Sequence, residues 1–584
     1  MSLSFPPAEV DIDTIPEDAQ LEVLAEVEKP RRPGISMGLE LVLLLVAGIF
    51  LALHFVHLRA DFPNHSPWMD WAKYTDEGWY GDAAIRHYQL GHWNVAGDFN
   101  PAAALPVWPA LELVLFRFTG VSLTAARAMT VVVFGLTLVC CYVLVRRWSG
   151  GRARRTLAPA VAVLLLAVNP FSFAFSRLAV LEPLLILLTL AALLTASMAG
   201  AAGERALGAW TRPFVVWSVA LGLLLPLMVL TKTTGMFLFP AVFWMLWAAC
   251  GYRMSLFARS AAMAGAVGAA GWGGYFLLFV RPRYLSDFRY LFSANGYTGI
   301  TRATFGAVIY DTIFDGTWIG QTLFWVALAA AGGSIASLCV LRRRSNPLVA
   351  ALLLWVFGYG AFLAYHANLQ PRYYLMLAVP LTMLTAIAFD AVLARAMPAR
   401  GGAMQWLARL GAGAGGAALL FAAAHGASIT IGFVRHPEYT WVRAAEQIRE
   451  VVDREARATG HSRMVLSISG SDLALITGLP AICDDFGTMT LPDRVAAYRP
   501  GWFATWNDVE DDKMEALAPV YRLVRVASIP AFDDPDRNLL ILYRLDPLNQ
   551  RGPAGKPGRR RTMIVPQRLR TRIGEQPSVT QLEH

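Results

Sequence analysis

Residues 36–57 read SMGLELVLLLVAGIFLALHFVH, an apolar run long enough for one helical crossing of a bilayer, which takes about 20 residues. Runs of similar length follow at 125–146, 157–176, 183–200, 214–231, 234–250, 259–280, 319–341, 347–365, 372–395 and 406–433. The composition agrees, because 56% of the residues are hydrophobic and 16% are charged, whereas about a quarter of a soluble domain is charged. The sequence therefore predicts a polytopic α-helical membrane protein with a bundle of about 11 transmembrane helices.

The basic residues predict how these spans are oriented. With the N-terminus inside, five short arginine-containing loops fall on the cytoplasmic side, at 146–155, 204–212, 252–259, 342–344 and 395–409. This is the pattern of the positive-inside rule, so we attribute the net charge of +9 to membrane orientation and expect no nucleic-acid partner. The pattern holds only if the short apolar run at 103–118 is a helix on the outer surface. We expect a multi-pass protein of the cell membrane (inner or plasma membrane) with a cytoplasmic N-terminus.

The segments outside the spans differ in character. Residues 1–35 are acidic and predict a disordered cytoplasmic tail, and residues 548–584 predict a disordered basic tail. The first external loop covers 58–124, and a second long external loop covers 281–318. Residues 436–547 alternate helical and strand-like patterns, which predicts a small C-terminal α/β domain on the extracytoplasmic side.

The first external loop contains the run YTDEGWYGDAAIRH at residues 74–87. Its acidic pair, Asp76 and Glu77, has two interpretations. In one, Thr75 or Asp76 caps a helix and Glu77 is favourable in its first turn. In the other, the two carboxylates belong to a catalytic site.

The same run offers further side chains with a structural and a functional interpretation. Asp82 and Arg86 are four residues apart, so on a helix they predict a solvent-exposed ion pair. Trp79 and Tyr80 fit an aromatic belt at the membrane surface, or a surface that contacts a sugar.

Other charged side chains fall on the same predicted outer face. Arg177 and Glu182 lie where one span passes into the next, Lys232 lies between two spans, and Arg372 opens a span. A charge within the hydrocarbon costs about 2.5–3.5 kcal/mol on insertion scales, so such side chains usually face a cavity. The alternative is that each side chain extends to the interface. The meeting of acids and bases on one side favours a cavity.

The long loop 281–318 carries positive charge on the predicted outer face, against the orientation rule. Its arginines include Arg281, Arg283 and Arg289. Arginine clusters bind phosphate groups, so these side chains are candidates for a phosphate site. Ordinary contact with lipid headgroups is the alternative.

Four motifs resemble one family. The Asp76–Glu77 pair, SRLAVLEP at 176–183, LTK at 230–232 and PRYY at 371–374 are similar to motifs of the dolichyl-phosphate-mannose–protein mannosyltransferase and aminoarabinose (lipid A) transferase superfamily. Its members have the GT-C glycosyltransferase fold, so the resemblance implies a GT-C-like transmembrane catalytic domain over residues 36–435. One departure is NPAAALPVWP at 100–109, which stands where the aminoarabinose transferases usually show Lys-Pro-Pro.

The resemblance also implies roles for individual residues. Asp76 corresponds to the catalytic base, with Glu77 or Glu182 orienting acceptor or donor. Lys232 and Arg372 correspond to the family's basic positions and are expected to hold phosphate, together with some of Arg281, Arg283 and Arg289. The side chains that we expect to contact the acceptor or the sugar are Trp79, Tyr80, Arg177 and Tyr373.

The expected activity is that of a membrane glycosyltransferase. Because nucleotide sugars are not expected outside, the donor is a polyprenyl-phosphate-linked sugar and the acceptor is a hydroxyl of a lipid, a protein or a cell-envelope glycan. The five cysteines show no metal-ligand spacing, and no ligand set for a divalent cation is evident, although such a cofactor is compatible with the family. Two alternatives stay open: a transporter or flippase of lipid-linked sugar precursors, and a GT-C-type glycan ligase or polymerase. The absence of an internal repeat in the sequence disfavours the transporter.

Overall fold

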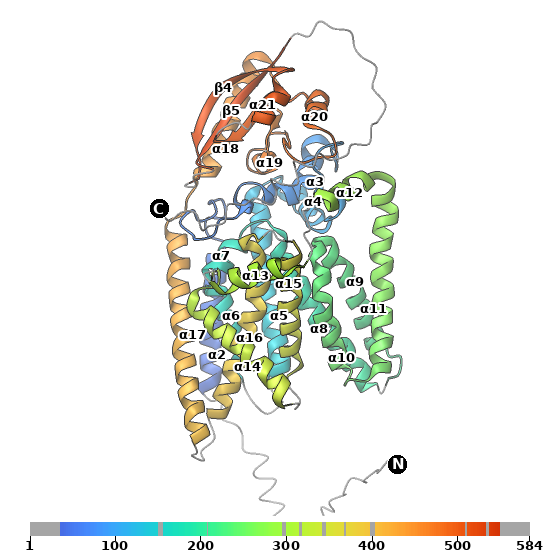
Figure 1. Ribbon diagram of the computed structural model, residues 1–584, viewed down its shortest axis with the longest axis vertical. Coiled ribbons are helices and arrows are strands. Elements are labelled where there is room, and N and C mark those ends of the chain that lie inside the picture. Colours follow the sequence, from blue (N-terminus) through green and yellow to red (C-terminus); the bar gives the residue numbers. More distant parts are fainter. Residues whose placement is uncertain are drawn as a thin grey trace, which may run out of the picture.

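The computed structural model of the chain describes residues 35–149, 156–206, 208–294, 300–314, 318–341, 346–366, 369–396, 403–507, 511–532 and 537–548. The two predicted terminal tails therefore lie almost wholly outside the described residues. The same is true of the whole predicted basic loop 342–344 and of parts of three others, at 150–155, 207 and 397–402. A bundle of long helices makes up most of the structure, and a smaller region of strands and short helices lies at one end of it (Figure 1).

Each predicted span coincides with helical structure. The helices of the bundle are α2 (Ile35–Leu53), α5 (Leu123–Ser149), α6 (Ala158–Val168), α7 (Pro170–Phe175), α8 (Leu181–Arg205), α9 (Arg212–Thr231), α10 (Phe239–Ala249), α11 (Met254–Tyr275), α14 (Gln321–Leu341), α15 (Pro347–His366), α16 (Leu375–Ala396) and α17 (Ala403–Arg435). Among the described residues, eight helical segments are long and apolar enough to cross a membrane, and three shorter apolar helices accompany them. The chain is therefore a multi-pass helical membrane protein, while the count of eleven crossings stays a prediction.

The predicted span 157–176 is interrupted. It forms α6 and α7, which are separated by Asn169. The side-chain oxygen of Asn169 accepts hydrogen bonds from the backbone N–H groups of Phe171 (2.9 Å) and Ser172 (3.1 Å), and Pro170 occupies the first position of α7. Asparagine at an N-cap followed by proline starts a new helix, so the backbone changes direction here.

The predicted loop 281–318 is largely helical. Helix α11 passes into a π-helix, η5 (Phe276–Tyr284), and then into α12 (Leu285–Ala294), and α13 (Arg302–Phe314) follows. Part of this predicted loop therefore continues the helix of the preceding span, and its place outside the membrane stays a prediction.

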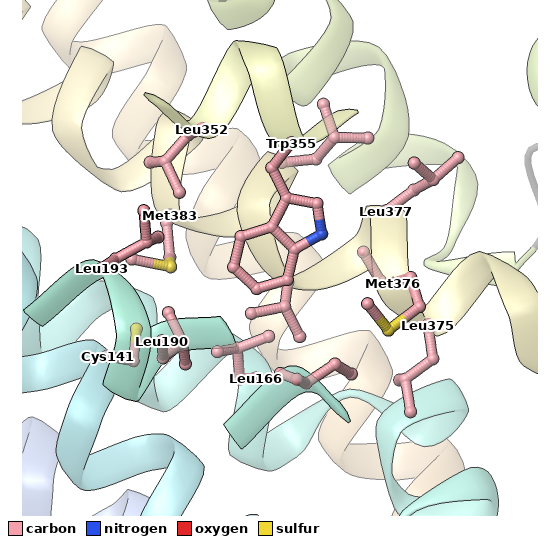
Figure 2. Packing of buried hydrophobic residues seen from close by; sticks show 14 of the residues in the cluster. Cys141, Leu166, Leu190, Leu193, Leu352, Trp355, Leu375, Met376, Leu377 and Met383 are labelled. Carbon is pink, nitrogen blue, oxygen red and sulfur yellow. The ribbon is translucent and has the colours of Figure 1, made fainter. Parts of the chain in front are cut away.

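The core of the bundle lies between α5, α6, α8, α15 and α16. Trp355 is fully buried there and is surrounded by leucine, methionine and cysteine side chains (Figure 2). The labelled neighbours are Cys141, Leu166, Leu190, Leu193, Leu352, Leu375, Met376, Leu377 and Met383. Close packing of this kind fixes the helices that carry the charged side chains described below.

Two short helices of the predicted first external loop lie at one end of the bundle. They are α3 (Asp76–Leu90) and α4 (Val107–Thr119), and they pack against each other beside α12 (Figure 1). The predicted surface helix at 103–118 corresponds to α4. Helix α3 also packs against the C-terminal region, so it lies between that region and the bundle.

The C-terminal region contains a mixed sheet. Its elements are α18 (Thr440–Thr459), β1 (Val465–Leu466), α19 (Gly470–Thr477), β2 (Ala481–Ile482), α20 (Leu491–Tyr498), β3 (Trp502–Trp506), α21 (Asp511–Leu517), β4 (Tyr521–Pro530) and β5 (Leu539–Pro547). In the described part of this region the strand order is β2-β1-β3-β5-β4. β1 pairs in parallel with β2 and β3, whereas β5 runs antiparallel to β3 and β4. Whether the region is an independent extracytoplasmic domain stays a prediction.

Candidate active site

The chain that leads into α3 places two aspartates side by side. Asp70 is the N-cap of a short 3₁₀ helix, η2 (Trp71–Lys73), where its side chain accepts a hydrogen bond from the N–H of Ala72 at 2.8 Å. Asp76 begins α3 directly afterwards, and the Thr75 hydroxyl donates a hydrogen bond to its Oδ1 at 2.9 Å. Both carboxylates are buried.

Arg372 joins these two aspartates. It lies in the 3₁₀ helix η7 (Pro371–Tyr374) that precedes α16. Its guanidinium binds Asp70 through Nη1 and binds Asp76 Oδ2 through Nη2 at 2.5 Å. Its Nε lies 3.8 Å from Oε1 of Glu182.

Glu182 and Lys232 complete the group. Glu182 is in the first turn of α8, and Lys232 follows the last residue of α9. Lys232 Nζ forms an ion pair with Glu182 Oε1. The ring of Tyr373 lies beneath both cations, 4.1 Å from Lys232 Nζ and 4.9 Å from the guanidinium carbon of Arg372, so cation–π attraction adds to the ion pairs. We call Asp70, Asp76, Glu182, Lys232, Arg372 and Tyr373 the acid–base cluster.

The cluster contains three carboxylates and two cations, all buried. Burial is the main cause that raises the pKa of Asp76 above its ordinary value, and the positive charge of Arg372 opposes that rise. Burial and the nearby Asp76 carboxylate raise the pKa of Tyr80 well above its ordinary value. Tyr80 is therefore close enough to the cluster for the Asp76 charge to affect its pKa, and it remains a neutral phenol that can donate one hydrogen bond.

Glu77 is adjacent to Asp76 in the sequence but binds other partners. Its Oε2 lies 2.5 Å from Nη2 of Arg127, and its Oε1 accepts hydrogen bonds from Arg127 Nε and from the N–H of Ala179, both at 2.8 Å. Arg127 also donates to the carbonyl oxygen of Leu58. Among the contacts of the described residues, Glu77 thus connects α3 to α5 and to the turn before α8, and the structure does not bring it into the acid–base cluster.

Two other predicted side chains lie outside the cluster. Trp79 donates a hydrogen bond from Nε1 to the carbonyl oxygen of Ile468 at 3.1 Å, so it faces the C-terminal region. Arg177 donates to the carbonyl oxygens of Val56 and His57 at 2.7 and 2.6 Å, which connects the turn before α8 to the chain after α2.

The three predicted phosphate-binding arginines of the long loop have exposed side chains. Arg281 and Arg283 lie on η5, and Arg289 lies on α12. Helix α12 contacts the first external loop through Asp287, whose Oδ1 accepts a hydrogen bond from Asn100 at 2.9 Å. These arginines are therefore near that loop, but they are not part of the acid–base cluster.

The pair of Asp82 and Arg86 forms as predicted, at 2.7 Å, but it is buried and not solvent-exposed. Arg86 also binds Asp98, and Asp98 lies 3.2 Å from Nη1 of Arg494 in α20. The C-terminal region covers this network, which is why the local sequence pattern did not predict its burial.

Asp70 was absent from the sequence prediction. The available signal was weak: it is an acid six residues before Asp76 in the same external loop. Within the described residues, no set of three or more histidine, cysteine, aspartate or glutamate side chains is arranged to hold a metal ion.

The sequence matches no protein-family model and no curated protein. Solved structures do match. ArnT from Cupriavidus metallidurans, solved with bound undecaprenyl phosphate, matches with a TM-score of 0.54 and 15% identity over 86% of this chain and 98% of that one. The apo oligosaccharyltransferase of Archaeoglobus fulgidus matches with a TM-score of 0.47 and 14% identity over 86% of this chain and 76% of that one.

Proposed function

With the GT-C fold of these membrane proteins as its architecture, we propose that the chain is a membrane glycosyltransferase that moves a sugar from a polyprenyl-phosphate donor to a hydroxyl acceptor. The acceptor class is a lipid, a protein or a cell-envelope glycan. The reaction takes place on the extracytoplasmic face of the cell membrane, by residues 36–435. The order of the loops in the sequence supports this orientation, since the short arginine-containing loops alternate with the predicted external loops.

The observation that carries the proposal is the acid–base cluster. Four separate segments of the chain bring three carboxylates and two cations together in a buried position at one end of the helix bundle. Buried ion pairs contribute little net stability and often less than apolar residues of the same volume. A group of this size with a raised carboxyl pKa is therefore better explained by chemistry than by packing.

The proposed reaction divides the work between the two kinds of charge. Asp76 removes the proton from the acceptor hydroxyl, whose oxygen forms a bond to the anomeric carbon of the donor. The bond between that carbon and the phosphate oxygen breaks, and its electron pair leaves on the phosphate. A single displacement inverts the anomeric centre. Burial raises the pKa of Asp76, and a carboxylate with a raised pKa is a stronger base near neutral pH.

Lys232 and Arg372 stabilise the polyprenyl phosphate that is released. Fixed cations in a buried site stabilise developing negative charge strongly, because little solvent screens it. Both cations are already paired with carboxylates here. The donor phosphate therefore competes with Glu182 and Asp76 for them, and Asp76 becomes free to accept a proton when the phosphate takes over Arg372. The undecaprenyl phosphate bound to the ArnT of matching fold supports a polyprenyl-phosphate ligand.

One relationship weighs against a transporter. Asp76 and Lys232 do not lie in separate cavities at opposite ends of the protein, since Arg372 and Glu182 connect them in one cluster. A single one-sided cluster favours catalysis over alternating access, in which the substrate site lies near the midplane.

The test is transfer of radiolabel from a polyprenyl-phosphate sugar in membranes that contain the chain. We expect Asp76→Asn to abolish transfer while the protein accumulates normally. The matched control is Glu515→Gln, which neutralises an exposed carboxylate of α21 and should leave transfer unchanged. Full transfer by Asp76→Asn would disprove the role of Asp76 as base. Mass spectrometry of glycans and lipids from cells with and without the protein identifies the acceptor.

A further inference from the structure

Helix α3, which carries Asp76 at its first position, lacks a cap from its own sequence. Thr75 occupies the N-cap position, but among the described contacts its side chain makes no capping hydrogen bond. Its hydroxyl, which has one hydrogen to donate, lies within hydrogen-bond distance of the carbonyl oxygen of Trp71 (3.0 Å) and of Asp76 Oδ1 (2.9 Å). The first N–H groups of a helix have no partner within the helix and are stabilised by a side-chain acceptor.

The acceptor comes from the far end of the chain. Oδ1 of Asp472 accepts a hydrogen bond from the backbone N–H of Gly78, across 394 positions of sequence. Gly78 is the third residue of α3, and this N–H is the one that an N-cap side chain normally binds. Asp472 is buried and lies in the first turn of α19. Its carboxyl group therefore lies at the N-terminal ends of two helices, α3 and α19. Burial and the nearby Glu77 carboxylate raise the pKa of Asp472 well above its ordinary value, and its Oδ1 accepts the Gly78 hydrogen bond whether or not the group carries a charge.

The approach of the two helices requires glycine at position 78. A Cβ atom on Gly78 would collide with the backbone of Ser471 and Asp472. Two more hydrogen bonds extend the contact: the Ser471 hydroxyl donates to Asp82 at 2.8 Å, and Trp79 donates to Ile468. The start of α19 and the chain just before it thus form hydrogen bonds with α3 at Gly78, Trp79 and Asp82.

We propose that Asp472 is a positioning residue for the candidate base: it caps α3 in place of a local side chain and so fixes the direction of the Asp76 carboxylate. The first turn of α3 then has two supports, Asp472 at Gly78 and Arg127 at Glu77. Between them, Asp76 is aligned with Arg372. This role gives the C-terminal region a direct part in the site, and its catalytic consequence rests on the function proposed above.

The test compares three variants of the full chain, purified in detergent. Asp472→Ala removes the acceptor, Asp472→Asn keeps an oxygen that can accept the Gly78 hydrogen bond, and Asp493→Ala is the matched control. Asp493 has the equivalent place in the first turn of α20, but its hydrogen bonds are to Thr490 of its own helix cap and not to α3. Transfer kinetics and hydrogen exchange of the segment 74–82 are measured for each.

For Asp472→Ala we expect kcat to fall roughly tenfold with little change in the KM for donor, because a misdirected base slows the chemical step and leaves phosphate binding intact. The amides of residues 74–82 should exchange faster. Asp472→Asn should retain most of the activity and protection, and Asp493→Ala should match the unmodified chain. Unchanged kcat and unchanged exchange in Asp472→Ala would overturn the proposal, as would an equal loss in Asp472→Asn.

The hydrogen-exchange measurement separates this inference from the proposed function. If the unmodified chain transfers no sugar, the glycosyltransferase proposal fails while exchange still decides whether Asp472 caps α3. If Asp472→Ala does not accumulate, the variant Gly78→Ala is used in its place. The added methyl group pushes α3 away from the backbone of α19, so we expect the same fall in kcat and the same faster exchange of residues 74–82.

Discussion

Asp70 binds Arg372 in two ways, accepting a hydrogen bond from the backbone N–H at 2.9 Å through Oδ2 and pairing with the guanidinium through Oδ1. One carboxylate thereby fixes both the position at which α16 begins and the direction of the arginine side chain. The same carboxylate also caps η2, two residues before Thr75. Asp70 thus sets the distance between the two chain segments that meet in the candidate active site.

Replacement of Asp70 should therefore impair both stability and transfer. Asp70→Ala leaves the backbone N–H of Arg372 without its acceptor and removes one of the carboxylates that pair with the guanidinium. We expect a loss of about 3 kcal/mol, the lower end for breaking a buried ion pair, because Arg372 retains Asp76. Thermal unfolding in detergent measures the loss. Asp70→Asn, which keeps an acceptor for the N–H, should lose less, and equal losses in the two variants would contradict this explanation.

Lys232 should contribute to binding of the donor phosphate. In Lys232→Met we expect the affinity for a polyprenyl phosphate to fall by about 1.5–3 kcal/mol, the usual contribution of a hydrogen bond to a charged group. Binding is measured by the displacement of a fluorescent polyprenyl phosphate. The control is Lys513→Met, which removes a buried lysine 3.3 Å from Asp484 in the C-terminal region and should leave affinity unchanged.

Glu182 provides a second variant for the same interaction. If the donor phosphate competes with Glu182 for Lys232, then Glu182→Gln should tighten phosphate binding while it slows transfer. Weaker binding in Glu182→Gln would show that Glu182 orients Lys232 and does not compete with the ligand.

The pH dependence of transfer follows from the environment of Asp76. Burial raises the pKa of Asp76, so it keeps its proton to a higher pH than an ordinary aspartate, and only the deprotonated form acts as base. The rate should therefore fall on the acidic side at a pH above the usual range of aspartate. Arg372 lowers the pKa of Asp76, so residual activity in Arg372→Gln should require a still higher pH, and Arg372→Lys should show a smaller displacement. If both variants had the same pH profile of kcat as the unmodified chain, Asp76 would be excluded as the titrating group.

Glu77 and Arg127 should behave as a structural pair. Arg127→Met leaves a buried carboxylate without its cation and should cost about 3–5 kcal/mol of stability. The double variant Glu77→Gln, Arg127→Met removes both charges and should be more stable than Arg127→Met alone. Thermal unfolding of the two proteins checks this order, and the reverse order would mean that Glu77 does not depend on Arg127.

The membrane class, the helical segments and the meeting of Asp76, Glu182, Lys232 and Arg372 were all accessible from the sequence. The length of an apolar run predicts a membrane span. Because successive loops lie on alternate sides of the membrane, the sequence also predicts which loop residues share a side, without any knowledge of packing. Asp70 was not accessible, because an aspartate before a short helical turn is common and its partner is 302 positions away.

The different partners of Asp76 and Glu77 were also beyond the sequence. Successive residues of an α-helix point about 100° apart, so two adjacent acids face different neighbours, and the tertiary packing alone decides which neighbours these are. The burial of Asp82 and Arg86 depends in the same way on a region that follows more than three hundred positions later.

The hydrogen bond between Gly78 and Asp472 also has a consequence for biosynthesis. The ribosome releases α3 long before α19, with all the later helices of the bundle between them. During that interval the first turn of α3 lacks the side-chain acceptor that Asp472 provides in the folded protein. If Asp472 positions α3 as proposed, the site is completed only when the C-terminal region has been made and has reached the end of the bundle that carries α3, so the proposed activity follows the synthesis of that region and does not build up span by span.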